Sequence, residues 1–435
     1  MNNKNDNGQS NTKKFLFVSF EALAVDLARK IKKEGNEVKF YIEDPTQKDI
    51  GDGMFEKIDD WKAYKDWADV IIFDDIGFGK EADALRKEGK AVVGGSVYTD
   101  NLEDKREIGQ KEMAEVKMDV LPSWDFTNFD AAIDFVVKNS DRYVLKPSGA
   151  AQNEKELLYV GKEDDGADMI HMLGLYKKNW SKKIKMFQLQ KFASGVEVAI
   201  GAFFNGKDFI YPININFEHK KMFPGEVGPS TGEMGTSMYW SKPNKLFEAT
   251  LEKMKEKLVQ SGYVGYIDVN CIANKKGVFP LEFTSRFGYP TINIQMDGIQ
   301  SPMGEFMDAI SHGVNYSLKT KNGFQVGVVI AVPPFPFNDP AAFKRYSEDA
   351  MVIFKKPNFD GIHSCDIKIV DDEWRLAGNS GYALVVTGNA ETMSDARDIV
   401  YKRIENIMIP NMFYRTDIGE RWKSDGDRLQ TWGYT

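Results

Sequence analysis

Two neighbouring segments, residues 265–270 and 280–288, carry oxygen-bearing and cationic side chains at strand spacing. Alternation along a strand would put five polar residues on shared faces: Asp268 and Asn270 in the first segment, and Glu282, Thr284 and Arg286 in the second. A turn at residues 273–277 predicts that the two strands form a hairpin. Hard oxygen ligands beside a guanidinium suit a magnesium-bound polyphosphate. A solvated polar face on an ordinary hairpin is the competing interpretation of this pair.

A lysine at the end of an apolar strand is a second candidate phosphate contact. Lys146 closes residues 143–147 and precedes small residues through Ala151. Such a lysine can reach a phosphate, and backbone N–H groups of a small-residue loop can close on one. The alternative is a surface lysine at a strand end. Residues 186–192 predict another strand, whose edge could hydrogen-bond an adenine or could simply be an ordinary strand.

A glycine-rich stretch, residues 224–235, is a candidate substrate loop. It has four glycines and two prolines, and Ser230 and Thr231 add hydroxyl groups. Glycines let the backbone approach a ligand closely. A long surface connection explains the same composition equally well.

The elements that would position these residues follow in three blocks. Residues 15–19, 38–42, 68–73 and 91–93 predict strands and residues 21–34 a helix, which indicates a small parallel sheet covered by helices. The first strand-to-helix turn, Ser19 to Leu23, lacks the glycines of a dinucleotide fingerprint, so NAD is not expected.

The second and third blocks alternate strands with helices. A helix is expected at 105–117. A strand at 196–204 should pair back on residues 186–192, Asn205-Gly206 marks a turn, and residues 209–212 continue the sheet. One amphipathic helix is predicted at 246–261, followed by the hairpin. The last block carries strands at 326–330, 367–370 and 382–386 and a helix at 393–407.

Composition limits the function classes. The chain has 435 residues, 42% of them hydrophobic, and a net charge of -8, which is typical of a multidomain globular protein and unfavourable for a nucleic-acid binder. Two cysteines and four histidines have no zinc-site spacing. The longest apolar run is too short to span a membrane, and residues 1–14 read as a disordered tail without a signal peptide. We expect a cytoplasmic protein, monomeric or homodimeric.

Taken in order, the candidate residues resemble the ATP-grasp superfamily and, within it, the phosphoribosylamine–glycine ligases of purine biosynthesis. The matching segments are residues 226–235, 281–288 and 413–419, in the family's order, and the resemblance spans about residues 15–422. It implies an α/β fold with an N-terminal parallel domain (15–100), an ATP-grasp domain of two subdomains enclosing ATP (101–322) and a small C-terminal subdomain (323–435).

The resemblance also implies roles for individual residues. The predicted ATP contacts are Lys105, Lys146, Gln190, Lys191, Phe192, Ala193 and Glu197. The predicted ligands of Mg²⁺ or Mn²⁺ are Asp268, Glu282 and Thr284. Arg286 and Lys146 would be catalytic, and the predicted substrate contacts are Gly228, Pro229, Ser230, Thr231, Gly232, Arg286 and Arg415, with Asp417 helping Arg415 to close the C-terminal subdomain.

The implied activity is an ADP-forming ligation through an acyl phosphate, which an amine then attacks. Its partners would be a small-molecule amine and a carboxylate, the latter possibly glycine. Three hypotheses stay open from the sequence: synthesis of glycinamide ribonucleotide, the same chemistry on a nucleoside, amino sugar or peptide amine, and a catalytically weakened ATP-binding protein. The first turn, which carries Glu21 and no glycine, favours the second hypothesis over the first.

Overall fold

The N-terminal segment forms a parallel sheet, as predicted. The computed structural model describes residues 12–148, 151 and 157–435. Its first sheet has the order β3-β2-β1-β4-β5 with parallel pairs throughout. The strands are β1 (Lys14–Ser19), β2 (Glu37–Ile42), β3 (Glu56–Ile58), β4 (Val70–Phe73) and β5 (Val92–Val93). Helices α1 (Val25–Lys33) and α2 (Gly79–Lys87) connect them.

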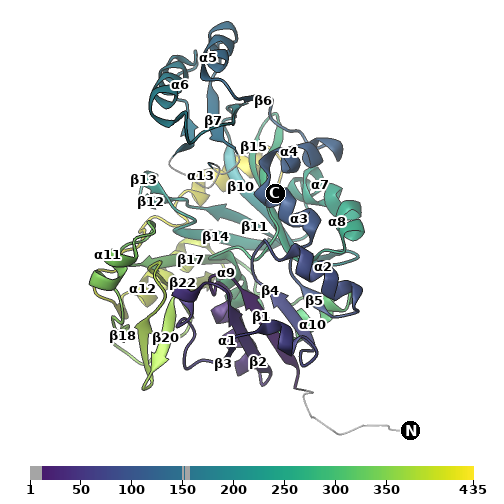
Figure 1. Ribbon diagram of the computed structural model, residues 1–435, viewed down its shortest axis with the longest axis vertical. Helices are drawn as coiled ribbons and strands as arrows, with labels where there is room; N and C mark the ends of the chain where they lie inside the picture. The colour runs from purple at the N-terminus through teal and green to yellow at the C-terminus, as the bar shows by residue number, and fades with distance from the viewer. Residues whose placement is uncertain (1–11, 149–150, 152–156) are drawn as a thin grey trace.

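A small four-stranded sheet with its own core lies at the opposite end of the molecule (Figure 1). Its order is β6-β9-β7-β8. The strands are β6 (Ser123–Phe126), β7 (Tyr143–Pro147), β8 (Tyr159–Val160) and β9 (Phe187–Lys191). Helices α5 (Phe129–Lys138) and α6 (Ala167–Trp180) pack together beside it, and α3 (Val97–Asp104) and α4 (Arg106–Glu115) precede it in the chain.

The largest element is an antiparallel sheet of eight strands in the order β16-β15-β10-β11-β14-β17-β22-β19. The strands are β10 (Val196–Asn205), β11 (Phe209–Glu218), β14 (Gly235–Ser241), β15 (Val264–Asn274), β16 (Gly277–Thr284), β17 (Phe324–Ala331), β19 (Ile362–Ser364) and β22 (Tyr382–Ala390). The C-terminal segment from residue 323 therefore extends the same sheet that carries the predicted metal hairpin.

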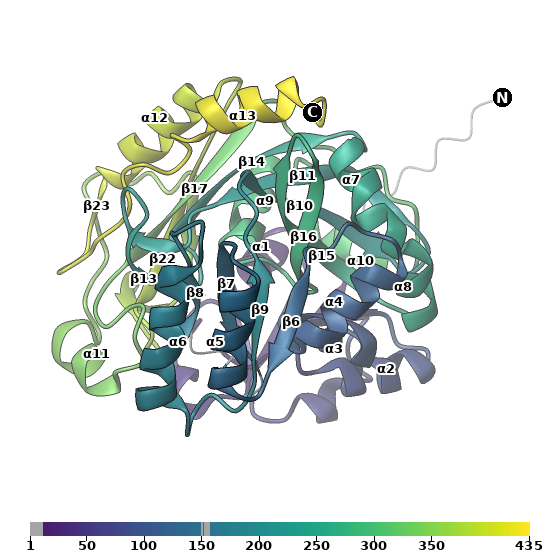
Figure 2. The ribbon, with the colours of Figure 1, turned by 90° about the horizontal axis from the view of Figure 1, so that it is seen from above.

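Short hairpins and helices complete the chain. The small strand pairs join β12 (Lys221–Phe223) to β13 (Val227–Ser230), β18 (Ile353–Phe354) to β23 (Ile407–Met408), and β20 (Ile367–Val370) to β21 (Glu373–Leu376). The helices are α7 (Lys245–Ala249), α8 (Lys255–Ser261), α9 (Thr291–Gly298), α10 (Met303–Ser311), α11 (Pro340–Tyr346), α12 (Met393–Ile404) and α13 (Trp422–Thr431). Seen from above, α12 and α13 cover one side of the large sheet (Figure 2).

Three sequence-based expectations differ from the structure. The first helix begins at Val25 instead of residue 21, because the Ser19 hydroxyl accepts the Ala22 N–H and Ala22 has a φ of 64°. The predicted pairing of β9 with β10 is wrong, since each belongs to a different sheet and the intervening residues cross between the two sheets. The single helix at 246–261 is broken by Thr250, whose backbone is not helical (φ -128°, ψ -99°).

Two further expectations concern the N-terminal tail, residues 1–14, and the lack of a run long enough to span a membrane. The predicted tail lies outside the described residues up to residue 11, and so do residues 149–150 of the small-residue loop after Lys146. Within the part of the chain that the structure describes, each helix is too short or too polar to cross a bilayer.

Candidate active site

The predicted hairpin forms, and it is one part of a polar face that spans four strands of the large sheet. Asp268 pairs with Thr284 and Asn270 pairs with Glu282 across β15 and β16. The neighbouring strands continue this face with Glu197 on β10 and with Asn214, Asn216 and Glu218 on β11. The opposite face of the same strands is apolar and buried, with Ile200, Ile215, Ile267 and Val269 in one core. Side-chain alternation along the strands therefore places the polar residues on one face of the sheet and the buried apolar core on the other.

Three acceptor oxygens on or beside this face are buried without a hydrogen-bond partner among the described residues. They are Asp268 Oδ1, Asn270 Oδ1 and Glu233 Oε1. Burial is the main cause that raises the pKa of Asp268 and of Glu233, and the charge of Glu218 raises both further. Burying oxygens without donors costs free energy, so this face is suited to a cation or to a ligand with N–H groups.

Lys220 lies at the centre of the carboxylates. Its Nζ is 3.2 Å from Glu197 Oε1, 3.3 Å from Glu218 Oε2 and 3.5 Å from Glu282 Oε1. Lys220 is the largest cause of the low pKa of Glu282, about 2, with Lys146 and Arg106 adding to the effect. The sequence reasoning missed Lys220, Glu218 and Glu233. The alternation Ile213-Asn-Ile-Asn-Phe-Glu218 could have extended the predicted strand to Glu218, but not to Lys220 or Glu233, which lie after it.

Lys146 reaches the same group of charges from the small sheet. It is 9% exposed at the end of β7, and burial followed by the charge of Arg106 lowers its pKa to about 8. Glu282, Lys220 and Glu197 also act on its charge. The structure thus brings Lys146, Glu197 and Glu282 together, and the ATP and metal contacts that the resemblance implies for them stay predictions. The small and the large sheets meet there.

Arg106 lies close enough to Lys146 for its charge to lower the pKa of that lysine. Its Nη1 donates to the Pro147 carbonyl at 2.7 Å, and the carboxylate of Glu282 acts on its charge. The predicted Lys105 precedes α4 and is exposed, and among the described residues its side chain has no hydrogen bond or ion pair. Its contact with ATP stays a prediction, and Arg106 is a candidate that the sequence reasoning did not include.

Arg286 is held by two carboxylates from different segments. Its Nε lies 2.9 Å from Asp75 Oδ1, after β4, and 3.1 Å from Glu103 Oε1, on α3. Its Nη1 donates to the Phe287 carbonyl at 2.9 Å. Burial opposes its charge, but Glu103 and Asp75 raise its pKa above the usual value. These contacts fix the guanidinium between the end of β4, helix α3 and the segment after β16.

The predicted adenine linker connects the small sheet to the large one. Gln190 is 1% exposed, and its Nε2 has no partner among the described residues. The N–H groups of Lys191 and Phe192 donate to the carbonyls of Pro122 and Arg142. Arg142 also stacks on the Phe192 ring at 3.5 Å, and Lys191 pairs with Asp141 at 2.6 Å. The linker backbone is therefore well fixed up to Phe192. Ala193 follows it half-buried, and its contact with adenine stays a prediction.

The glycine-rich stretch is a hairpin, β12–β13, instead of an open loop. Gly228 and Gly232 are exposed, Pro229 and Ser230 are half-buried, and Gly228 has a φ of 88°. Thr231 is buried, and both its N–H and its hydroxyl donate to the Lys220 carbonyl. These two bonds tie the end of the hairpin to the segment that carries Lys220.

Arg415 fixes the same hairpin from the C-terminal segment. Its side chain is 1% exposed and contacts Glu226 Oε1 at 2.7 Å, both oxygens of Asp417 at 2.8 Å, and the Lys221 carbonyl at 2.9 Å. Because these acceptors already engage the guanidinium, the contacts describe a structural clamp. Its predicted contact with a substrate stays a prediction.

The predicted metal ligands Asp268, Glu282 and Thr284 lie on the paired strands β15 and β16. Within residues 12–148, 151 and 157–435, no three His, Cys, Asp or Glu side chains converge as a ready metal cluster. The Lys220 ammonium occupies the space between the carboxylates instead. The unpaired Asp268 oxygen and the exposed Glu282 carboxylate are nevertheless hard ligands of the kind that Mg²⁺ prefers.

A family comparison decides the fold. Residues 108–292 match the model described as the phosphoribosylglycinamide synthetase ATP-grasp (A) domain. The chain has the ATP-grasp fold. The matched residues contain the small sheet that supplies Lys146 and the strands β10, β11, β14, β15 and β16 of the large sheet, with the hairpin of Asp268, Glu282 and Arg286. The predicted fold class and resemblance are confirmed.

The chain is similar to curated phosphoribosylamine–glycine ligases. It is 26% identical over 355 residues to a phosphoribosylamine–glycine ligase of Listeria monocytogenes, covering 78% of this chain and 80% of the relative. It is 25% identical over 355 residues to the corresponding ligase of Corynebacterium ammoniagenes, with 78% and 79% covered. These matches confirm the predicted class of enzyme, an ATP-dependent, ADP-forming carboxylate–amine ligase.

Solved structures show the same ATP-grasp fold. Phosphoribosylamine–glycine ligase from Thermotoga maritima has a TM-score of 0.71 at 19% identity, covering 93% of this chain and 100% of that one. The biotin carboxylase domain of the Hydrogenobacter thermophilus 2-oxoglutarate carboxylase, in complex with MgADP and bicarbonate, has a TM-score of 0.65 at 13% identity, with 97% and 96% covered.

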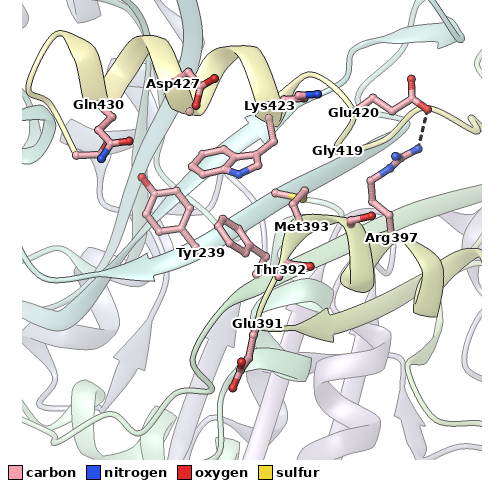
Figure 3. Close-up of a pocket in the computed structure, with 15 residues that line it drawn as sticks. Tyr239, Glu391, Thr392, Met393, Arg397, Gly419, Glu420, Lys423, Asp427 and Gln430 are labelled. Atoms are coloured by element: carbon pink, nitrogen blue, oxygen red, sulfur yellow. Dashed lines mark hydrogen bonds and ion pairs between the residues drawn. The ribbon is translucent and has the colours of Figure 1, made fainter.

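A separate cavity of about 790 Å³ lies beside α13, away from these residues (Figure 3). Aromatic side chains of Tyr239, Phe324 and Trp422 line it, and the Arg397–Glu420 ion pair lies at its rim. None of the predicted site residues lines it. The cavity and the polar face are therefore separate features of the structure.

Proposed function

We propose that this enzyme phosphorylates the carboxylate of glycine with ATP and joins the resulting acyl phosphate to an amine, as the name of its phosphoribosylamine–glycine ligase relatives implies. The observation that supports this most strongly is the meeting of Lys146, from the small sheet, with Glu282 and Lys220, from the large sheet, in one group of charges. ATP would lie between these sheets, with its adenine at residues 190–193 and its ribose near Glu197.

The chemistry needs positioning and charge neutralisation more than a protein nucleophile. In the first step the carboxylate oxygen attacks the γ-phosphorus, and ADP leaves. In the second step the amine nitrogen attacks the acyl carbon, the C–N bond forms, and phosphate leaves with one amine proton as HPO₄²⁻. Lys146 and Arg106 would bind phosphate oxygens, and Arg286 would stabilise the transferring phosphoryl group.

Asp268, Glu282 and Thr284 would be the ligands of a divalent cation in this arrangement. When bound, Mg²⁺ would neutralise charge on the polyphosphate. If Glu282 bound the cation through Oε1, Lys220 would have to give up its 3.5 Å contact with that oxygen. The hydroxyl groups of Ser230 and Thr231 and the glycines of the β12–β13 hairpin would close on the substrate.

The test uses hydroxylamine in place of the natural amine. An acyl phosphate reacts with hydroxylamine to give a hydroxamate, so ATP, Mg²⁺, glycine and hydroxylamine should yield ADP and glycine hydroxamate in equal amounts. Omitting glycine should abolish both products. ADP formation that does not depend on any carboxylate, or formation of AMP, would contradict the proposal.

A further inference from the structure

The short loop between β13 and β14, residues 231–234, holds a glutamate in a fixed position beside the polar face. The Thr231 N–H donates to the Lys220 carbonyl at 2.8 Å, and the Met234 N–H donates to the His219 carbonyl at 2.8 Å. Backbone hydrogen bonds therefore fix the loop on both sides of Glu233. They place Glu233 next to the segment that carries the Lys220 side chain, where the glycine-rich hairpin meets the large sheet.

The Glu233 side chain is a buried acid without a cationic partner. The residue is 7% exposed, and its Oε1 has no hydrogen-bond partner. Among residues 12–148, 151 and 157–435, no lysine, arginine or histidine forms an ion pair with it. Burying a carboxylate in this way costs free energy, and a ligand that brings N–H groups and positive charge to Oε1 would recover it.

The other acids of the polar face already have a cation or a proposed role. Three of them share the Lys220 ammonium at 3.2–3.5 Å, namely Glu197, Glu218 and Glu282. Asp268 is a proposed ligand of the divalent cation. Of the acids described on or beside this face, Glu233 is the one that neither pairs with Lys220 nor serves as a proposed metal ligand, so its oxygen is available to the substrate.

The proposed carboxylate substrate carries a group of the matching chemistry. Glycine is a zwitterion at neutral pH, and its ammonium lies two bonds from the carboxyl carbon that becomes the acyl phosphate. The ammonium takes no part in phosphoryl transfer, and it offers three N–H donors and one positive charge to a carboxylate. An opposite charge at this distance would also keep the buried Glu233 carboxyl ionised.

Building on the proposed ligase function, we propose that Glu233 binds the ammonium of glycine and thereby selects an α-amino carboxylate over carboxylates that lack the amino group. Ser230 and Thr231 lie two to three residues before Glu233, so one short segment would contact both ends of the substrate. The contact is a charged hydrogen bond, and no covalent bond forms or breaks at Glu233. Its role is to set substrate specificity and to orient the carboxylate toward the γ-phosphoryl group.

The test compares glycine with glycolate in the hydroxamate assay, because glycolate keeps the carboxylate and the size of glycine and replaces the ammonium by a hydroxyl group. The unmodified enzyme should have a kcat/KM for glycine about 100-fold or more above that for glycolate. Glu233→Gln should lower kcat/KM for glycine about 30-fold, mainly through the KM for glycine, and change the KM for ATP by no more than about twofold. Glu248→Gln, exposed on α7, makes the same change of charge and should keep the preference for glycine.

A preference for glycine below about tenfold in the unmodified enzyme, or an unchanged preference in Glu233→Gln, would overturn the inference while leaving the ligase function intact. If neither carboxylate gives a hydroxamate, the ligase proposal itself fails. Calorimetry of glycine and glycolate with the unmodified enzyme, Mg²⁺ and a non-hydrolysable ATP analogue then decides the inference without turnover. Tighter binding of glycine that is lost in Glu233→Gln would support it, and equal binding of the two carboxylates would contradict it.

Discussion

Replacing Lys220 with methionine should expose the repulsion that this ammonium suppresses. Methionine keeps most of the length of the side chain and removes the charge, which leaves Glu197, Glu218 and Glu282 facing one another. Two unit charges 3.3 Å apart interact by about 1 kcal/mol in water and about 5 kcal/mol at an effective dielectric constant of 20. The three N–O distances lie between 3.2 and 3.5 Å.

Exposure decides which of those values applies to each pair. The side chains of Glu282 and Glu197 are 54% and 37% exposed, so their pairs with Lys220 belong near the lower value or below it. The Glu218 side chain is only 11% exposed, so the energy of its pair with Lys220 should lie above the value for water. Allowing for desolvation, we expect a net loss of about 2–4 kcal/mol of stability without divalent cations.

The assay is thermal unfolding at pH 7 in EDTA and again in millimolar Mg²⁺. The Lys220→Met melting temperature should fall in EDTA and recover with Mg²⁺, because the cation can take the place of the ammonium. The control is Lys221→Met, which makes the same charge change one residue away. Equal melting temperatures for both variants in EDTA, with no response to Mg²⁺, would refute the reasoning.

Three further predictions concern single residues. Arg286→Ala should lower the rate of ADP formation by about 10²-fold or more at saturating ATP, since it removes a donor to the developing charge; a rate within threefold of the unmodified enzyme would contradict this role. ATP binding should weaken above about pH 8, where Lys146 of the free enzyme loses its proton. Lys146→Met should bind ATP weakly and without this pH dependence. If calorimetry shows that ATP binding to the unmodified enzyme does not change with pH, Lys146 does not have this role. The pKa of Asp74 rises from 3.8 to about 7 on folding, so the free energy of unfolding should fall by up to about 4 kcal/mol as the pH rises between these values. Asp74→Asn should therefore melt at a higher temperature than the unmodified protein at pH 8 but not at pH 4. A difference in melting temperature that does not depend on pH would contradict the burial argument.

Local patterns predicted the elements that carry the chemistry. The alternation of Asp268 with Asn270 and of Glu282 with Thr284 was sufficient to predict the hairpin and its polar face, because a strand has a side-chain period of two. The buried strands of the N-terminal sheet could be predicted from another local pattern. Uninterrupted apolar runs bounded by turn residues favour strands that are covered on both faces.

Contacts between distant segments could not be predicted this way. Lys220 meets Glu282 across 62 residues, and Arg286 meets Glu103 across 183. Neither pair has a local signature. The predicted β9–β10 hairpin failed because a glycine turn between two strands does not show whether the second strand pairs with the first or enters another sheet. Asp74 follows the predicted strand at 68–73, but only the folded turn shows that its carboxylate accepts the Ala24 N–H at 2.9 Å.

The central claim is that the carboxylate is activated as an acyl phosphate. The most direct measurement uses glycine labelled with ¹⁸O in both carboxylate oxygens, together with ATP, Mg²⁺ and hydroxylamine, and mass spectrometry of the released phosphate. The account predicts one ¹⁸O atom in each phosphate formed, because the C–O bond of the acyl phosphate breaks when the amine attacks. Unlabelled phosphate would show that ATP is hydrolysed by water and would contradict the proposed mechanism.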